Sequence, residues 1–154
     1  MADSVRKKIY DELLSRLGNI ASASGYNTDP GVYDDQQAAH TAHDAVSLWV
    51  TFGEESFDLP QRTLGGGQPA TLVMQVHGYC RKQADRDSLV ALQEQALQDI
   101  RNALQVDFGD WKANAGATMQ GFDTCETDEG VLAFDGMAFI SQPLVLSYVA
   151  GPTW

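Results

Sequence analysis

Apolar residues recur every three or four positions in two segments, which is the spacing of one buried helix face. Ser4 or Asp3 can cap the first helix and Gly18 should end it, while Asp85, Asp87 and Ser88 can begin the second. The first set is Val5, Ile9, Leu13, Leu17 and Ile20. The second set is Leu89, Leu92, Ala96, Leu97, Ile100, Ala103 and Leu104. We therefore predict two amphipathic helices.

Apolar and polar residues alternate in two further segments, 45–52 and 71–79, as in half-buried strands. The first places Val46, Leu48, Val50 and Phe52 on one face and Ser47, Trp49 and Thr51 on the other. The second places Leu72, Met74 and Val76 on its apolar face. Together they predict an antiparallel hairpin with one buried face.

Three connections separate these elements. Residues 26–44 contain turn residues and no sustained period, so they predict a long connection. Residues 53–69 carry Gly65-Gly66-Gly67 between the hairpin strands, and we expect this loop to project from the sheet. Phe108 and Trp111 follow the second helix, where we expect both aromatic rings to anchor a loop on the core.

The final third predicts strands at 117–126, 131–140 and 144–149, with a turn around 128–130. Pro143 has no N–H for a sheet ladder and so indicates a bulge, a strand start or an edge, while Leu144, Leu146 and Tyr148 share a face. The element order predicts an α+β fold: an antiparallel or mixed β-sheet with two helices packed on one face and a long projecting hairpin loop. We expect one domain covering residues 1–154.

The net charge of −11 disfavours nucleic-acid binding through phosphate neutralisation, although an acidic wall past which DNA slides stays possible. No apolar run is long enough to span a bilayer, and the N-terminal segment lacks a signal-peptide core, so we expect a cytoplasmic protein without a membrane partner. Cys80 and Cys125 are predicted to be two buried thiols and not a disulfide.

Residues for catalysis do not form a recognisable pattern. His40 and His43 lack the spacing and the third ligand of a helical zinc site, and Gly65-Gly66-Gly67 lacks the following Lys and Ser/Thr of a phosphate loop. We predict no enzyme, no cofactor and no metal. Acidic residues gather late in the chain, as a solvated face or as a surface that lines a channel or meets a basic partner. They are Asp107, Asp110, Asp123, Glu126, Asp128, Glu129 and Asp135.

The chain resembles the tail-terminator (minor tail protein U-like) family of long-tailed bacteriophages. The resemblance rests on the opening helix, the hairpin with its overlong loop, a second helix ending Asp-Ile-Arg-Asn-Ala-Leu, and the closing strand 142–148. It covers nearly the whole chain, in size and element order, without an invariant motif.

The resemblance implies a virion structural protein of the tail or neck, assembled in the host cytoplasm. It would form a homo-oligomeric ring, a hexamer, that caps the tail tube, stops tube polymerisation and joins the tail to the head connector. Its partners would be the tail tube protein and the head-tail connector protein, with DNA passing through the lumen without specific binding.

Interface residues should lie in the two long connections, because aromatic, apolar and Arg side chains dominate interface energetics. The candidates are Tyr33, Phe57, Leu59, Arg62 and Leu64. Three alternatives stay open: another neck or tail-completion protein of the head-tail interface, a small cytoplasmic ligand-binding domain that closes its Gly-rich loop over a ligand, and a small metalloenzyme using His40 and His43.

Overall fold

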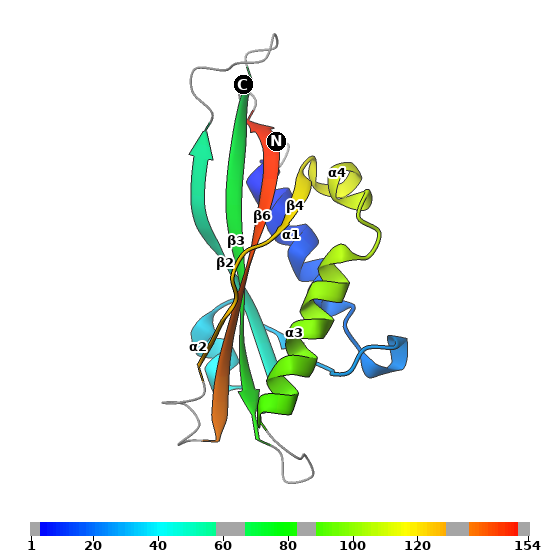
Figure 1. Cartoon of the computed structure of the whole chain (residues 1–154), viewed down its shortest axis with the longest axis vertical. Coiled ribbons are helices and arrows are strands. Elements are labelled where there is room, and N and C mark those ends of the chain that lie inside the picture. The colour runs from blue at the N-terminus through cyan, green and yellow to red at the C-terminus, as the bar shows by residue number, and fades with distance from the viewer. Residues whose placement is uncertain (1–3, 58–66, 83–88, 129–135, 151–154) are drawn as a thin grey trace.

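The computed structural model describes residues 4–57, 67–82, 89–128 and 136–150. One mixed sheet runs in the order β1-β2-β3-β6-β4, with β5 also paired to β6 (Figure 1). The elements in chain order are α1 (Val5–Gly18), the short 3-10 helix η1 (Ser22–Ser24), β1 (Gly31–Val32), α2 (Gln36–Thr41), β2 (Val46–Phe57), β3 (Gln68–Arg81), α3 (Leu89–Gln105), α4 (Asp110–Ala115), β4 (Thr118–Phe122), β5 (Glu126–Asp128) and β6 (Met137–Ala150).

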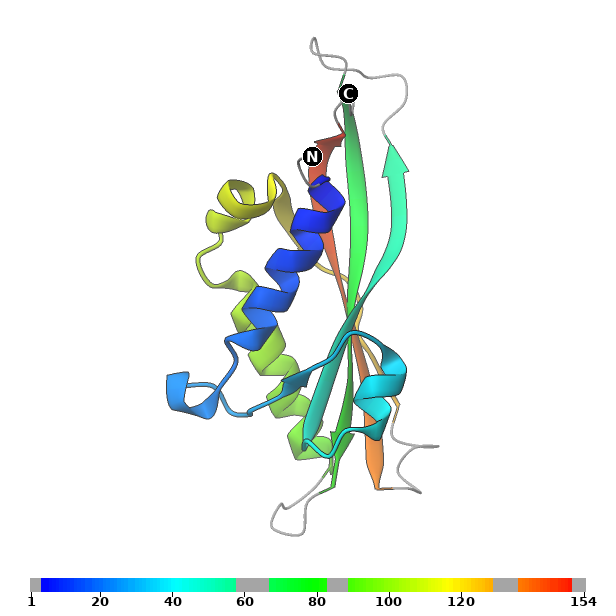
Figure 2. The same ribbon diagram turned by 180° about the vertical axis from the view of Figure 1, so that it is seen from behind.

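The predicted fold class is confirmed. β3 lies between β2 and β6 and pairs antiparallel with both, while β1 pairs parallel with β2 and makes the sheet mixed. Both predicted helices, α1 and α3, pack on one face of the sheet, which we call the helix side (Figures 1 and 2). The predicted projecting loop falls largely on residues 58–66, outside the described ranges.

Both helices form where the apolar spacing predicts them. The Ser4 hydroxyl accepts the Lys7 backbone N–H 3.1 Å away and so caps α1, and α1 ends at Gly18 as expected. Side chains of the predicted faces form the core, including Ile9, Leu13 and Leu17 on α1. The proposed caps of α3 at residues 85–88 lie outside the described residues.

The segment 26–44 is more structured than the sequence indicates. It contains β1, which pairs with Ser47 and Leu48 of β2, and α2, whose first turn is capped by the Asp35 carboxylate at the Ala38 N–H. The prediction of a plain connection was wrong because a strand and a helix this short do not repeat a period often enough to reveal it.

β2 extends beyond its predicted end at Phe52 and continues to Phe57. A bulge between Phe52 and Glu55 absorbs one extra residue, so pairing with β3 resumes on the far side. Phe52, expected in the buried row, is 42% exposed and stacks on Tyr10, with its ring centroid 4.6 Å from the Arg6 guanidinium carbon. The prediction of one buried hairpin face is wrong at Trp49, which is buried on the other face.

β6 is one continuous strand through Pro143, although the sequence predicts two. The Pro143 carbonyl accepts the Asp123 N–H, so its nitrogen faces the same side of the strand, toward β4 and β5. β4 has already ended at Phe122 there and β5 begins at Glu126, so no ladder bond requires an N–H from Pro143. Similarly, β4 and β5 occupy the segment predicted as one strand, while Leu144, Leu146 and Tyr148 share the buried face as predicted.

Within the described residues, no helix is both long enough and apolar enough to cross a membrane.

Candidate assembly interface

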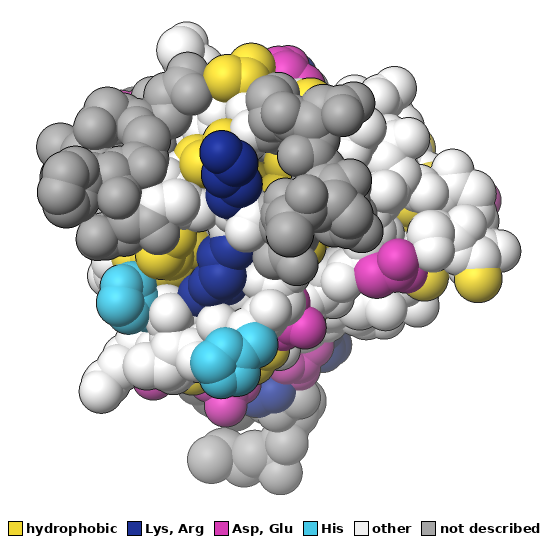
Figure 3. Space-filling model, turned by 90° about the horizontal axis from the view of Figure 1, so that it is seen from below, with side chains coloured by type: hydrophobic (Ala, Val, Ile, Leu, Met, Phe, Trp, Pro, Cys, Tyr) yellow, Lys and Arg dark blue, Asp and Glu magenta, His cyan; other side chains and the backbone are white. Residues whose placement is uncertain are grey.

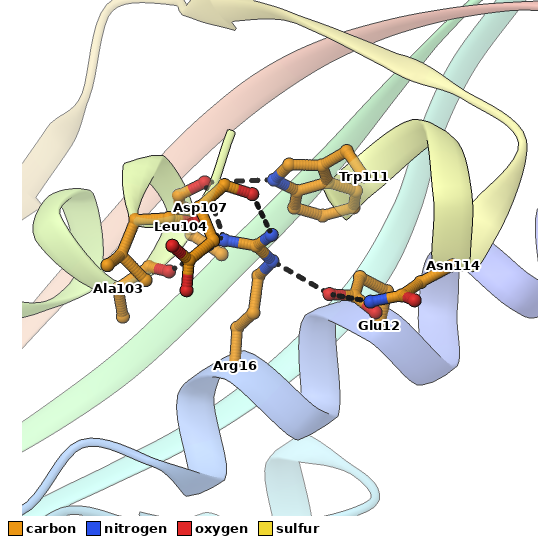
Figure 4. Close-up of polar contacts among 8 residues, drawn as sticks. Glu12, Arg16, Ala103, Leu104, Asp107, Trp111 and Asn114 are labelled. Carbon is orange, nitrogen blue, oxygen red and sulfur yellow. Dashed lines mark hydrogen bonds and ion pairs between the residues drawn. The ribbon is translucent and has the colours of Figure 1, made fainter. Parts of the chain in front are cut away.

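On the helix side, Arg16 of α1 is buried among the last residues of α3 (Figure 4). Its Nε donates to the Glu12 carboxylate at 2.9 Å. Its terminal nitrogens donate to the backbone carbonyls of Ala103, Leu104, Val106 and Asp107. These are carbonyls at and just beyond the end of a helix, where internal partners run out, so the guanidinium satisfies them and its charge complements the helix dipole.

Trp111 completes the same junction from α4. The ring is fully buried, its indole N–H donates to the Leu104 carbonyl at 2.9 Å, and the Arg16 guanidinium carbon lies 4.8 Å from the ring centroid. The predicted anchoring is therefore confirmed for Trp111, although on a short helix. It is wrong for Phe108, which is 50% exposed.

The turn between α3 and α4 presents Phe108 together with Val106, which is 51% exposed. Asp107 between them has a φ of 48°, a conformation that few non-glycine residues adopt. Arg16 binds the carbonyls of both Val106 and Asp107, so this turn is fixed to α1 while its two apolar side chains face solvent.

A buried carboxylate fixes the neighbouring loop. Asp99 of α3 is 1% exposed and accepts the backbone N–H groups of Asn27 and Thr28, at 3.0 and 2.8 Å, and the Thr28 hydroxyl at 2.5 Å. Arg16 and Asp99 thus hold charges inside the helix side, and each is surrounded by hydrogen-bond partners. Neither position stands out in the sequence, because every partner but Glu12 is distant along the chain.

The other face of the sheet, which we call the far face, is covered by α2 at one end (Figure 2). Ala39 of α2 packs there against an aromatic cluster of Trp49, Tyr79 and Phe139. Arg81 of β3 donates to the carbonyls of Ala39 and His40, at 2.5 and 2.8 Å, and so caps the end of α2.

His77 lies in the middle of this cluster, stacked between Trp49 and Phe139 at centroid distances of 5.2 and 5.9 Å. Its Nε2 is 2.7 Å from the Thr51 hydroxyl, while its buried Nδ1 has no hydrogen-bond partner among the described residues. Burial lowers the pKa of His77 from 6.5, and the nearby Glu126 carboxylate opposes this shift. His77 is therefore a neutral, packed side chain of the aromatic cluster.

The remaining half of the far face carries no helix in the described part of the chain (Figures 1 and 2). Strand alternation and the register place Thr51, Thr71, Val73, Gln75, Thr118, Pro143, Val145, Ser147 and Val149 on it, and we call this set the open face. None of these residues is charged, although Asp, Glu, Lys and Arg make up 20% of the chain.

The sequence carries a signal for the open face. Segments 67–80 and 136–154 contain no Asp, Glu, Lys or Arg, and they include nearly all of the two neighbouring strands β3 and β6. Burial on the helix side explains the lack of charge at half of those positions, since alternate residues belong to the core. The uncharged residues on the far face need another explanation, because solvent-exposed sheet faces usually carry polar and charged residues.

Tyr33 and Phe57 are the described members of the predicted interface set, and the structure does not bring them together. Tyr33 packs beside the aromatic cluster, where its hydroxyl donates to the Asp44 carboxylate, and this hydrogen bond raises the pKa of Tyr33. Phe57 is 46% exposed at the end of β2, paired with Ala70. Leu59, Arg62 and Leu64 lie outside the described residues.

His40 and His43 are exposed, at the end of the molecule where α2 and the end of β3 lie. Figure 3 views this end and shows histidine and basic side chains beside acidic ones. Within the described residues, no three His, Cys, Asp or Glu side chains form a group that could hold a metal ion. Cys80 and Cys125 are free thiols, as predicted, but Cys80 alone of the two is buried and Cys125 is partly exposed. Burial raises the pKa of Cys80 to about 12, which makes its thiol unreactive.

Comparison with known proteins yields no family model and no curated protein that matches the chain. A solved structure of the sheath/tube terminator of an extracellular contractile injection system (PVC), in its extended state, is similar at a TM-score of 0.46 and 14% sequence identity. The alignment covers 97% of this chain and 60% of that chain, so this chain spans 60% of the neighbour's length. A likeness at this level does not establish a shared family or function.

Proposed function

We propose that this protein is a structural subunit of a tail-like assembly, which forms a ring that caps a tail tube, stops its polymerisation and joins it to a head connector. The observation that carries the proposal is the uncharged open face on a chain with a net charge of −11. Protein interfaces are depleted of charged residues at their centre and keep polar residues at the rim. Glu54, exposed in the β2 bulge, and Glu126, exposed on β5, lie beside the open face as such a rim.

The size of the open face suits an interface. At standard strand rise and spacing, four strands of this half-sheet cover roughly 26 by 19 Å, or about 500 Å². A partner that covered the open face would bury about 1,000 Å² of solvent-accessible surface, counted over both partners, which is at the lower limit of specific interfaces. We therefore expect a subunit that associates reversibly and becomes stable when several contacts close into one ring.

The tail-terminator role follows from the resemblance in element order and size, and the open face adds a surface for it. A hexameric ring, a tube protein on one side, a connector on the other and DNA in an acidic lumen belong to this proposal. Within it, Tyr33, Phe57, Leu59, Arg62 and Leu64 remain proposed contacts with a neighbour or the tube. Phe57 has the exposure that such a contact requires.

A pair of valines tests the proposal. Val149 on the open face and Val90 on α3 are 49% and 47% exposed, so the same substitution removes the same surface at two places. We expect Val149→Asp to lower the concentration-dependent mass measured by light scattering toward the monomer, because it places a charge in the interface. Val90→Asp should assemble like wild type. Equal masses for both variants and wild type, at matched concentrations, would contradict the proposal.

A further inference from the structure

The turn between α3 and α4 lies on the helix side of the molecule (Figure 1). Its two apolar side chains, Val106 and Phe108, are exposed. Each has about half of its surface exposed, and they are two residues apart on one turn. We call this pair the knob. An exposed aromatic ring beside an exposed valine is typical of an interface anchor, because large apolar side chains supply most of the energy of association.

The knob is rigid, which distinguishes it from an ordinary exposed loop. The buried Arg16 donates to the carbonyls of Val106 and Asp107, and Trp111 bounds the other side of the junction. The backbone between the two apolar residues is held in the left-handed conformation at Asp107. A turn ordered before binding loses little conformational entropy when it binds, so its contacts contribute more to affinity.

The knob and the open face lie on opposite sides of the sheet. Figures 1 and 2 show the α3–α4 turn on the outer surface of the helix layer, while the open face looks away from that layer. α4 packs against β4, the edge strand of the same half of the sheet, so both patches lie in one half of the molecule. Two different patches on opposite sides of a subunit produce a head-to-tail contact, which closes into a ring if the rotation allows.

The charges around the knob favour the open face as its binding surface. Asp107 and Asp110 are exposed beside the knob, so an acidic surface would repel it. The chain carries 21 acidic and 10 basic residues, so its net charge opposes association through its acidic surfaces. The open face has no charged side chain and offers hydroxyl and amide groups of Ser, Thr and Gln that can donate to the acidic residues beside the knob.

We propose that the knob of one copy docks on the open face of the next copy, and that this contact is the repeating interface of the assembly. The inference rests on the proposed self-association and specifies which two surfaces meet. Arg16 serves as a positioning residue for this contact, since it fixes the turn without being exposed itself.

Cross-linking between two variants that each carry one introduced, accessible cysteine tests this contact directly. Phe108→Cys and Val145→Cys are each made with Cys125→Ser, while the buried Cys80 is retained. The two proteins are mixed while dilute, concentrated together and treated with a short bismaleimide. We expect a covalent species of twice the subunit mass in the mixture, and little of it in either protein alone, because a head-to-tail contact pairs position 108 with position 145.

The control replaces Phe108→Cys by Val90→Cys, because Val90 has a similar exposure and lies at the start of α3, away from the knob. The mixture of this variant with Val145→Cys should give at most a few per cent of the cross-linked product. Equal cross-linking by the control, or by either variant alone, would overturn the docking arrangement. The docking arrangement would also be overturned if the mixture gave no product although light scattering of the same mixture shows multimers. The proposed self-association would then stand. A monomer at every concentration would overturn both proposals.

Discussion

The two faces of the sheet differ in how their polar groups are satisfied. On the helix side, the charged groups that enter the core, Arg16 and Asp99, meet partners within the chain. On the open face, residues such as Val73, Val145 and Thr71 remain accessible and lack a covering layer in the described part of the chain. The charged groups of the helix side are satisfied within the isolated subunit, while the open face has the composition of an interface that a partner would cover.

This difference separates two kinds of residue that are both apolar. Leu146 and Val145 are neighbours on β6, yet the first is fully buried under the helices and the second lies on the open face. We expect substitutions in the core row to change the free energy of unfolding, and substitutions on the open face to change association with little effect on folding.

The largest expected effect lies on the helix side. Arg16→Met removes the guanidinium that satisfies the carbonyls at the end of α3. It also removes the ion-pair partner of the partly buried Glu12 carboxylate, which keeps the Asn114 amide as a hydrogen-bond donor. We expect a loss of about 3 to 5 kcal/mol in the free energy of unfolding, measured by urea denaturation. Arg6 also forms an ion pair, with Glu55, but its own side chain is 46% exposed, so Arg6→Met should lose at most about 1 kcal/mol. Similar losses in both variants would contradict the role assigned to Arg16.

A smaller effect tests the end of the far face that α2 covers. Because burial lowers the pKa of His77 below 6.5, the unfolded chain takes up a proton there first as the pH falls. The neutral imidazole contributes stability that is fully present above about pH 6.5 and is lost as the pH falls through the lower folded-state pKa. We expect His77→Phe to lose less stability than wild type between about pH 7.5 and pH 5.5, measured by thermal unfolding.

Indistinguishable curves for wild type and His77→Phe would contradict the assignment of His77 as a neutral side chain whose protonation destabilises the cluster.

Features that repeat along the chain could be predicted from the sequence, and features that depend on one distant contact could not. α1 and α3 were predicted because their apolar spacing continues over several turns. The burial of Arg16 could not be predicted, because its partners other than Glu12 lie 87 or more residues away along the chain, from Ala103 onward. The continuation of β6 through Pro143 was missed because it depends on where β4 ends.

The interface residues nominated from the sequence stay predictions. Among the aromatic residues in the connections, Phe57 is exposed, whereas Tyr33 lies beside the aromatic cluster. Phe108 was assigned to the core because a large aromatic ring after a helix is usually buried. Its exposure results from the turn at Asp107, which Arg16 fixes from another helix. The residues of the open face could be identified only from the strand register, because a shift of one residue would place the core residues on the far face instead.

The most direct test of the central claim is the mass of the wild-type protein in solution, measured by light scattering from low to high concentration. The account predicts a mass that rises with concentration from the 16.7 kDa subunit and reaches a plateau at a closed ring. A constant monomer mass over the whole range would contradict the claim that the open face is an interface between copies of this chain.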